Sequence, residues 1–144
     1  MVQFDDPAFA ESLVRRLDSN ARFARETRWF DGSILLESDG ARLWLKVYRG
    51  KVIDHLPFQP PLGYTFKLGG PGAAWASLLS GERRYADLVT PGVRHFEGDP
   101  NLERLGEMTS ELGLEGNLME ASRLTEAVHT LVEVILEVGR EGRA

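Results

Sequence analysis

The stretch LGGPGAAWASLLSGERRYADLVTPGVRHFEGD, residues 68–99, decides how this chain folds. A strand is expected to end at Leu68, where two glycines turn the backbone ahead of Pro71, whose fixed φ suits the first position of a helix. Gly81 is expected to end that helix, because glycine readily adopts the left-handed conformation that follows a last helical turn. The helix carries an apolar stripe at the i, i+3, i+4 spacing, made of Trp75, Leu78 and Leu79.

The second half of the stretch predicts a polar helix, a turn and a strand. The helix covers Glu82–Leu88, the turn covers residues 90–92, and the strand covers Val93–Glu97. Another helix is expected to begin at Pro100, because Asp99 is a good N-cap and proline is favoured at the position after it. The stretch therefore predicts strand, two helices and strand, and it contains no catalytic motif.

The residues before this stretch predict one helix and three strands. Asp6 and Pro7 begin a helix that is expected to end near Asn20, with a further helical turn through Phe23. Alternating apolar and polar residues then indicate strands of a half-buried sheet. Two hairpin turns join these strands into a meander. The strands are Trp29–Glu37, Ala41–Tyr48 and Lys51–Leu56.

A crossover loop and further elements complete the pattern. Pro57–Gly63 contains three prolines and is expected to be the loop, because proline lacks the N–H that a sheet ladder needs. A fourth strand follows at Tyr64–Leu68. Towards the C-terminus two helices are expected, with glycines separating them. The helices are Pro100–Leu112 and Asn117 to about Val138, and the glycines are Gly113 and Gly116.

Together these elements predict an α+β protein, with residues 1–144 forming a single domain. The expected architecture is one five-stranded mixed sheet with helices covering one face, because sheet and helices carry matching apolar stripes that must be buried together. The inner face of the sheet is expected to carry Phe30, Ile34, Leu36, Leu43, Leu45, Val47 and Phe66. The outer face is expected to carry Trp29, Leu35, Trp44 and Tyr48.

Composition and charge exclude several classes of protein. The chain has no cysteine, which excludes disulfides, thiolate catalysis and cysteine-bound zinc. No run reaches the ~18 apolar residues of a membrane span, so stable membrane insertion is not expected. Residues 101–144 hold 4 basic and 9 acidic side chains, which accounts for the whole net charge of −5 and disfavours nucleic acid as a partner.

The expected compartment is the cytoplasm. The N-terminus places acidic residues early and lacks the basic-then-apolar order of a secretory signal. Fourteen arginines against three lysines, with abundant glycine and alanine, suit a bacterial source.

The search for catalytic residues is largely negative. No Gly-x-Ser-x-Gly motif surrounds a serine, and the glycine cluster 69–72 lacks the Lys-Ser/Thr of a phosphate-binding loop. His129 lies one turn from Glu126 and Glu133, which leaves open a surface histidine or an acid–base or metal-binding role. We therefore predict a protein that is not an enzyme and needs no metal or cofactor. The histidines fall on different elements and spell out no metal site; they are His55, His95 and His129.

The order of these elements resembles the sterol carrier protein type 2 superfamily of small lipid-binding domains. The resemblance rests on Trp75-x-x-Leu78-x-x-Gly81, on the closing strand between Gly92 and Gly98-Asp99, and on the hairpin Arg49-Gly50-Lys51-Val52. It extends from about Phe9 to Val138. Members of that family hold acyl chains, acyl-CoA or sterols in a tunnel between sheet and helices. The resemblance therefore implies a hydrophobic ligand, lined by Phe30, Ile34, Leu36, Leu45, Phe66, Trp75, Leu78, Leu79, Leu124, Val128 and Leu131.

Trp75 shows why the residues alone leave the function open. It can be a core tryptophan packed under the sheet, or it can line a cavity for an apolar ligand, because both use the same residue types. The first hypothesis is a non-enzymatic carrier of a fatty acid, acyl-CoA or sterol-like lipid. The alternative is an interaction module with a filled core, whose outer sheet face binds a partner or a second copy in a homodimer.

Overall fold

The computed structural model describes residues 1–89 and 112–141. Asp6 caps the first helix, where its side chain accepts a hydrogen bond from the Ala8 N–H, and Pro7 occupies the first helical position as predicted. The elements are α1 (Pro7–Asp18), α2 (Ala21–Glu26), β1 (Asp31–Ser38), β2 (Ala41–Tyr48), β3 (Lys51–Leu56), β4 (Phe66–Gly70), α3 (Gly72–Leu79), α4 (Tyr85–Val89), β5 (Gly113–Gly116), α6 (Leu118–Arg123) and α7 (Thr125–Glu141).

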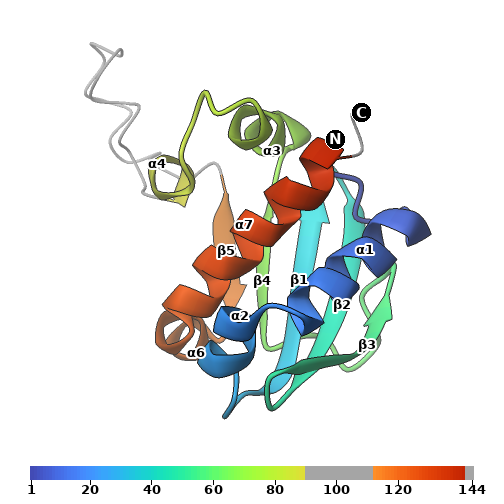
Figure 1. Ribbon diagram of the computed structural model, residues 1–144, viewed down its shortest axis with the longest axis vertical. Helices are drawn as coiled ribbons and strands as arrows, with labels where there is room; N and C mark the ends of the chain where they lie inside the picture. The colour runs from blue at the N-terminus through green and yellow to red at the C-terminus, as the bar shows by residue number, and fades with distance from the viewer. Residues whose placement is uncertain (90–111, 142–144) are drawn as a thin grey trace.

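One mixed sheet lies at the centre of the structure. Its strand order is β3-β2-β1-β4-β5. β1 is antiparallel to β2 and parallel to β4, and β5 is antiparallel to β4. Figure 1 shows α1, α2 and α7 on the same face of this sheet, with α7 running diagonally across it. The predicted α+β architecture, with five strands and helices over one face, is confirmed.

The two hairpin turns of the meander have the backbone that their sequences predict. Asp39 and Gly40 have φ values of 49° and 87°, and Arg49 and Gly50 have values of 45° and 91°. Two consecutive residues with positive φ form the turn whose twist matches that of antiparallel strands. β2 and β3 consequently begin and end at the predicted residues.

The core lies between the sheet and the helices. All seven residues that we predicted for the inner face are buried. α1 adds Phe9, Leu13 and Leu17 from one stripe, as its spacing predicts. The buried stripe of α7 includes Ala127, Val128, Leu131, Val134, Ile135 and Val138.

The outer face of the sheet is only partly exposed. Leu35 is fully buried, Trp44 is half-buried and Tyr48 is exposed. Trp29, which we predicted for this face, precedes β1 and is exposed in a groove beside α2 and α6, so it does not belong to the outer face. β3 and β4 run in the same direction with β1 and β2 between them, so the connection 57–65 must cross one face of the sheet. Figure 1 shows it passing behind the sheet, on the side away from α1 and α7.

The opening stretch departs from prediction at its glycines. Gly69 and Gly70 continue β4 instead of turning the backbone after Leu68, so β4 begins and ends two residues later than predicted. A Cβ on Gly69 would lie 2.9 Å from the Cβ of Glu37, which explains why this strand position is a glycine. Pro71 is the N-cap of α3 and not its first residue, while Gly81 follows the helix with φ +78° as predicted.

The bounds of three further elements differ from those predicted from the sequence. β1 covers Asp31–Ser38 instead of Trp29–Glu37, and α4 covers Tyr85–Val89 instead of beginning at residue 82. The last helix is interrupted: Leu124 leaves helical geometry with φ −102° and ψ 22°, which separates α6 from α7.

The fifth strand is where we predicted a break between helices. Residues 113–116 form β5 at the edge of the sheet. The predicted helix break was wrong, because this strand depends on pairing with β4, which is distant in sequence. Four predicted features lie outside the described residues: the turn at 90–92, the strand Val93–Glu97, the cap Asp99 and the helix from Pro100. Leu112, the last residue predicted for that helix, is described; it is buried and not helical.

Candidate functional site: an apolar pocket beside the last helices

An apolar pocket of about 340 Å³ lies where α4, β5, α6 and α7 meet. This volume is within the range of small-molecule sites, roughly 300–1,000 Å³. The lining is mostly aliphatic, with a few polar groups. It comprises Tyr85, Val89, Leu114, Leu118, Ala121, Ser122, Thr125, Val128 and His129.

Local capping and pairing position the walls of this pocket. The Asn117 backbone N–H donates to the Thr65 carbonyl at 2.8 Å, which ties the start of α6 to the strand side of the molecule. The Asn117 side chain accepts a hydrogen bond from the Glu120 N–H at 3.1 Å and caps α6. The interruption at Leu124 then redirects the chain, so that Ala121 on α6 and Val128 on α7 line the same pocket.

One side of the pocket carries polar groups. The Tyr85 ring meets the His129 ring edge-to-face, with centroids 5.1 Å apart. Burial raises the pKa of Tyr85 from 10.0 to about 12. Ser122 and Thr125 are exposed at the rim, where the Thr125 hydroxyl donates to the Ser122 carbonyl at 2.7 Å. The pocket therefore offers an apolar surface with hydrogen-bonding groups along one rim.

The eleven residues implied by the family resemblance are all buried. Val128 lines the pocket described above. Phe30 and Leu124 line a smaller groove of about 200 Å³ beside Trp29. Trp75 and Leu79 line a separate pocket of about 410 Å³ near the N-terminus. The remaining residues lie within the core; they are Ile34, Leu36, Leu45, Phe66, Leu78 and Leu131.

Trp75 has the contacts of a packed core residue. It is almost fully buried, and its indole Nε1–H donates to the Glu37 carbonyl at 3.0 Å. Its ring meets Phe4 edge-to-face, with centroids 5.1 Å apart. A buried tryptophan whose N–H is satisfied in this way joins α3 to the end of β1.

Sequence reasoning missed most of the pocket. Leu114 was placed in a helix break, and Tyr85 in a polar helix, where it is the lone aromatic among charged residues. His129 was considered and left open; the structure places it at the rim. The described residues contain no group of three or more acidic or histidine side chains arranged to hold a metal ion.

This chain resembles known proteins in its structure and matches no protein family by sequence. No protein-family model matches the chain, and a search of curated proteins finds no match. Solved structures do match over nearly the whole length. A crystal structure of sterol carrier protein 2 has a TM-score of 0.63 and 15% identity, covering 92% of this chain and 97% of its own. The chain has the sterol carrier protein 2 fold.

Two further structures agree with this assignment. A conserved hypothetical protein from Thermus thermophilus, described as possibly a sterol carrier protein, has a TM-score of 0.64 and 18% identity, covering 96% of this chain and 91% of its own. The apo form of sterol carrier protein 2 from Yarrowia lipolytica has a TM-score of 0.50 and 14% identity, with coverages of 94% and 95%. The family resemblance predicted from the sequence is thus confirmed for the fold, by solved structures that share 14–18% of their residues with this chain. In the described part of the chain, no helix is both long and apolar enough to cross a membrane.

Proposed function

We propose that this protein binds a hydrophobic ligand, namely a fatty acid, acyl-CoA or sterol-like lipid, and carries it without chemical change. The observation that carries the proposal is the apolar pocket of about 340 Å³ beside the last helices of a sterol carrier fold. Its aliphatic wall suits a hydrocarbon tail. Ser122, Thr125 and His129 at the rim suit a polar head, because a charged head group is costly to bury without partners.

Apolar burial supplies the driving force. Each methylene removed from water contributes about 0.8 kcal/mol. Association and ordering remove several kcal/mol, so micromolar affinity is the expectation. Within this proposal, Val128 lies in the pocket and Leu131 lies one helical turn further along the same buried stripe of α7. The six predicted residues that lie within the core form the proposed deeper lining that a longer ligand would contact, whereas Trp75 and Leu79 line the separate pocket near the N-terminus.

A carrier explains the pocket better than an enzyme does. Among the described residues no hydrogen bond joins His129 to a serine or threonine hydroxyl, which a nucleophile activated by a base would need. The Tyr85 phenol is protonated at neutral pH, as any tyrosine is, and burial raises its pKa further, to about 12, which makes it a poor nucleophile or base. We therefore propose a non-enzymatic role, and a cytoplasmic location stays a prediction.

A second candidate function is an interaction module. Trp29 and Tyr48 are exposed, as a contact surface would require. A homodimer built on the outer face of the sheet would use the same patch twice. Analytical ultracentrifugation tests the homodimer: a dimer that Trp44→Glu converts to monomer favours the module. A wild-type protein that is monomeric at high concentration, with Trp44 open to a fluorescence quencher, removes the covered outer face.

The direct test of the carrier is displacement of an environment-sensitive fluorescent fatty acid by unlabelled fatty acids of graded length. Affinity should rise about fourfold for each added methylene, the equivalent of 0.8 kcal/mol, until the pocket is full, and then level off. No probe binding at tens of micromolar, or an affinity independent of chain length, contradicts the proposal.

A further inference from the structure

A second pocket lies where the start of the chain, the end of β1 and α3 come together, at the upper end of Figure 1. Its volume is about 410 Å³, which is within the range of small-molecule sites. Its apolar wall includes Val2, Trp75, Ala76 and Leu79. We call it the N-terminal pocket. No described residue lines both this pocket and the pocket beside the last helices.

Ser38 places an unsatisfied hydroxyl in the N-terminal pocket. This residue ends β1 and is only 8% exposed, and within residues 1–89 and 112–141 its Oγ makes no hydrogen bond. A Cβ on Gly72 would lie 3.6 Å from this Oγ, so the hydroxyl lies beside the first residue of α3. A buried hydroxyl without a partner is costly, and a ligand that donates a hydrogen bond to it would remove that cost.

Two carboxylates line the same pocket. Asp39, in the turn after β1, lies so close to Gly72 that a Cβ there would collide with its Oδ2. Asp5 lines the pocket from the start of the chain. Neither carboxylate forms an ion pair within the described residues. The N-terminus of α3 offsets about half of one charge, so the two carboxylates leave the pocket negative.

Two cationic groups near the pocket have other partners. The Arg42 guanidinium pairs with Glu37 at 3.0 Å. The Met1 ammonium donates to the Gly139 carbonyl at 2.8 Å, near the end of α7. In the part of the chain that the structure describes, no lysine, arginine or histidine lines the N-terminal pocket.

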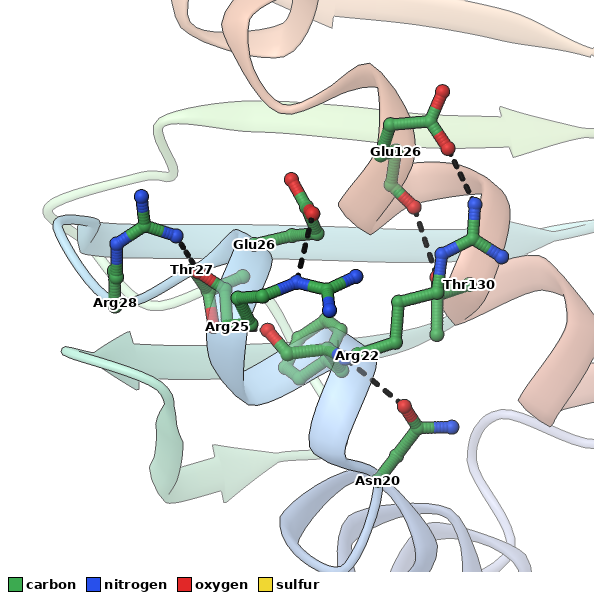
Figure 2. A network of polar contacts seen from close by, with 9 residues as sticks. Asn20, Arg22, Arg25, Glu26, Thr27, Arg28, Glu126 and Thr130 are labelled. Atoms are coloured by element: carbon green, nitrogen blue, oxygen red, sulfur yellow. Dashed lines mark hydrogen bonds and ion pairs between the residues drawn. The ribbon is translucent and has the colours of Figure 1, made fainter.

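The acidic side chains drawn in Figure 2 show the contrast, because each is paired with an arginine. Glu126 of α7 pairs with Arg22, and Glu26 pairs with Arg25. The carboxylates of the N-terminal pocket have no such arginine among the described residues and share the pocket with an apolar wall. The pocket therefore complements a ligand that combines a positive charge with an apolar body.

We propose that the N-terminal pocket binds a small organic amine in its protonated form, with a primary ammonium group carried on an apolar body. A primary ammonium has three N–H donors, which match the carboxylates of Asp5 and Asp39 and the hydroxyl of Ser38. Hydrogen bonds between ionised groups are stronger than those between neutral ones. The apolar body would be buried against Trp75 and Leu79. This site is independent of the proposed carrier function, which uses the pocket beside α6 and α7.

The test is isothermal titration calorimetry of the wild-type protein with phenethylammonium and three analogues of the same body. Phenethylammonium should bind at least about tenfold more tightly than phenethyl alcohol, because only the ammonium forms charged hydrogen bonds. Phenethyltrimethylammonium keeps the charge but lacks N–H donors, so it should bind about tenfold more weakly than phenethylammonium. Phenylpropanoate, which is anionic, should bind more weakly than the alcohol.

Substitutions of the polar groups test their assigned roles. Ser38→Ala, Asp5→Asn and Asp39→Asn should each weaken phenethylammonium binding about tenfold. Asparagine suits the position of Asp39, whose φ is 49°, because it tolerates the left-handed conformation. The two asparagine variants should bind phenethyl alcohol like wild type, which separates the loss of charge from the loss of the pocket.

A blocking variant and two matched controls locate the bound amine. Ala76→Phe fills the N-terminal pocket and should abolish phenethylammonium binding. Ala121→Phe adds the same bulk to the pocket beside the last helices, and Glu126→Gln removes a negative charge at the other end of α7. Both controls should bind phenethylammonium like wild type, and circular dichroism should show that every variant is folded.

The outcomes separate this proposal from the carrier function. No phenethylammonium binding at millimolar concentration, equal affinity for the ammonium and the alcohol, or loss of binding in Ala121→Phe with retention in Ala76→Phe overturns the amine proposal. If fatty acid binds while phenethylammonium does not, the amine proposal fails and the carrier function stands. If phenethylammonium binds as predicted while no fatty acid binds, the amine proposal stands and the carrier function fails.

Discussion

Tyr85 gives the pocket a titration that can be followed in solution. Burial raises the pKa of Tyr85 to about 12, from 10.0. The unfolded chain therefore loses this proton before the folded chain does, and stability falls as pH rises above about 10 and levels off above about 12. Tyr85→Phe should remove this part of the alkaline loss of stability while the pocket keeps its shape. Thermal unfolding between pH 8 and 12 measures it.

Tyrosinate absorbance provides a second reading of the same group. A titration of the wild-type protein should contain a step near pH 12 that Tyr85→Phe removes. If the variant and the wild type give the same late step, Tyr85 is not packed, partly buried, against α7 as the structure shows.

Gly116 of β5 shows what a single strand position requires from the neighbouring strand. Gly116 has φ +101°, and a Cβ there would lie 2.7 Å from the Thr65 carbonyl. Gly116→Ala should therefore combine backbone strain with a steric clash, lowering the free energy of unfolding by about 2–3 kcal/mol. Urea denaturation is the measurement.

Gly40→Ala is the matched control. Gly40 also has positive φ, at 87°, but a Cβ there would meet nothing within 4 Å. This variant should lose only about 1 kcal/mol, from the left-handed backbone alone. Equal losses in the two variants would mean that β5 does not pack against Thr65.

The elements that could be predicted from sequence are those specified by neighbouring residues. Asp39-Gly40 and Arg49-Gly50 each encode a tight turn, and the strands between and after them have the predicted bounds. β5 could not be found this way, because four residues with glycine at both ends become a strand only by pairing with β4. The helix interruption at Leu124 likewise has no local signal.

The contrast between local and long-range signals also explains which residues of the candidate site could be predicted from the sequence. Val128 was identified because it falls on the apolar stripe of the last helix. Leu114 and Ala121 were missed because the pocket is formed by β5 and by the separation of α6 from α7. Burial of the implied ligand residues could be predicted from their periodicity, whereas their distribution among several pockets depends on long-range packing.

At the scale of the whole molecule, α7 holds distant parts of the chain together. Arg16 of α1 pairs with Glu137 and Glu141, and the Arg140 guanidinium donates to the carbonyls of Leu78 and Leu79. Deleting residues from Asn117 onward should expose the inner face of the sheet and give aggregation-prone protein. Size-exclusion chromatography and thermal unfolding measure this, with deletion of residues 142–144 as the control.

One result of this deletion would contradict the role that we assign to the last helices. If the chain that ends before Asn117 stays monomeric and unfolds in a sharp thermal transition, the last helices are peripheral. The buried stripe of α7 would then contribute little to the core.

The central claim is that the pocket beside α6 and α7 holds the ligand. It is tested most directly by comparing the dissociation constants of one long-chain fatty acid for two variants. Ala121→Phe adds bulk inside the pocket, and Ala76→Phe adds the same bulk to the separate pocket near the N-terminus. We predict at least tenfold weaker binding for Ala121→Phe and wild-type affinity for Ala76→Phe. Wild-type affinity for Ala121→Phe in a folded protein would contradict the claim.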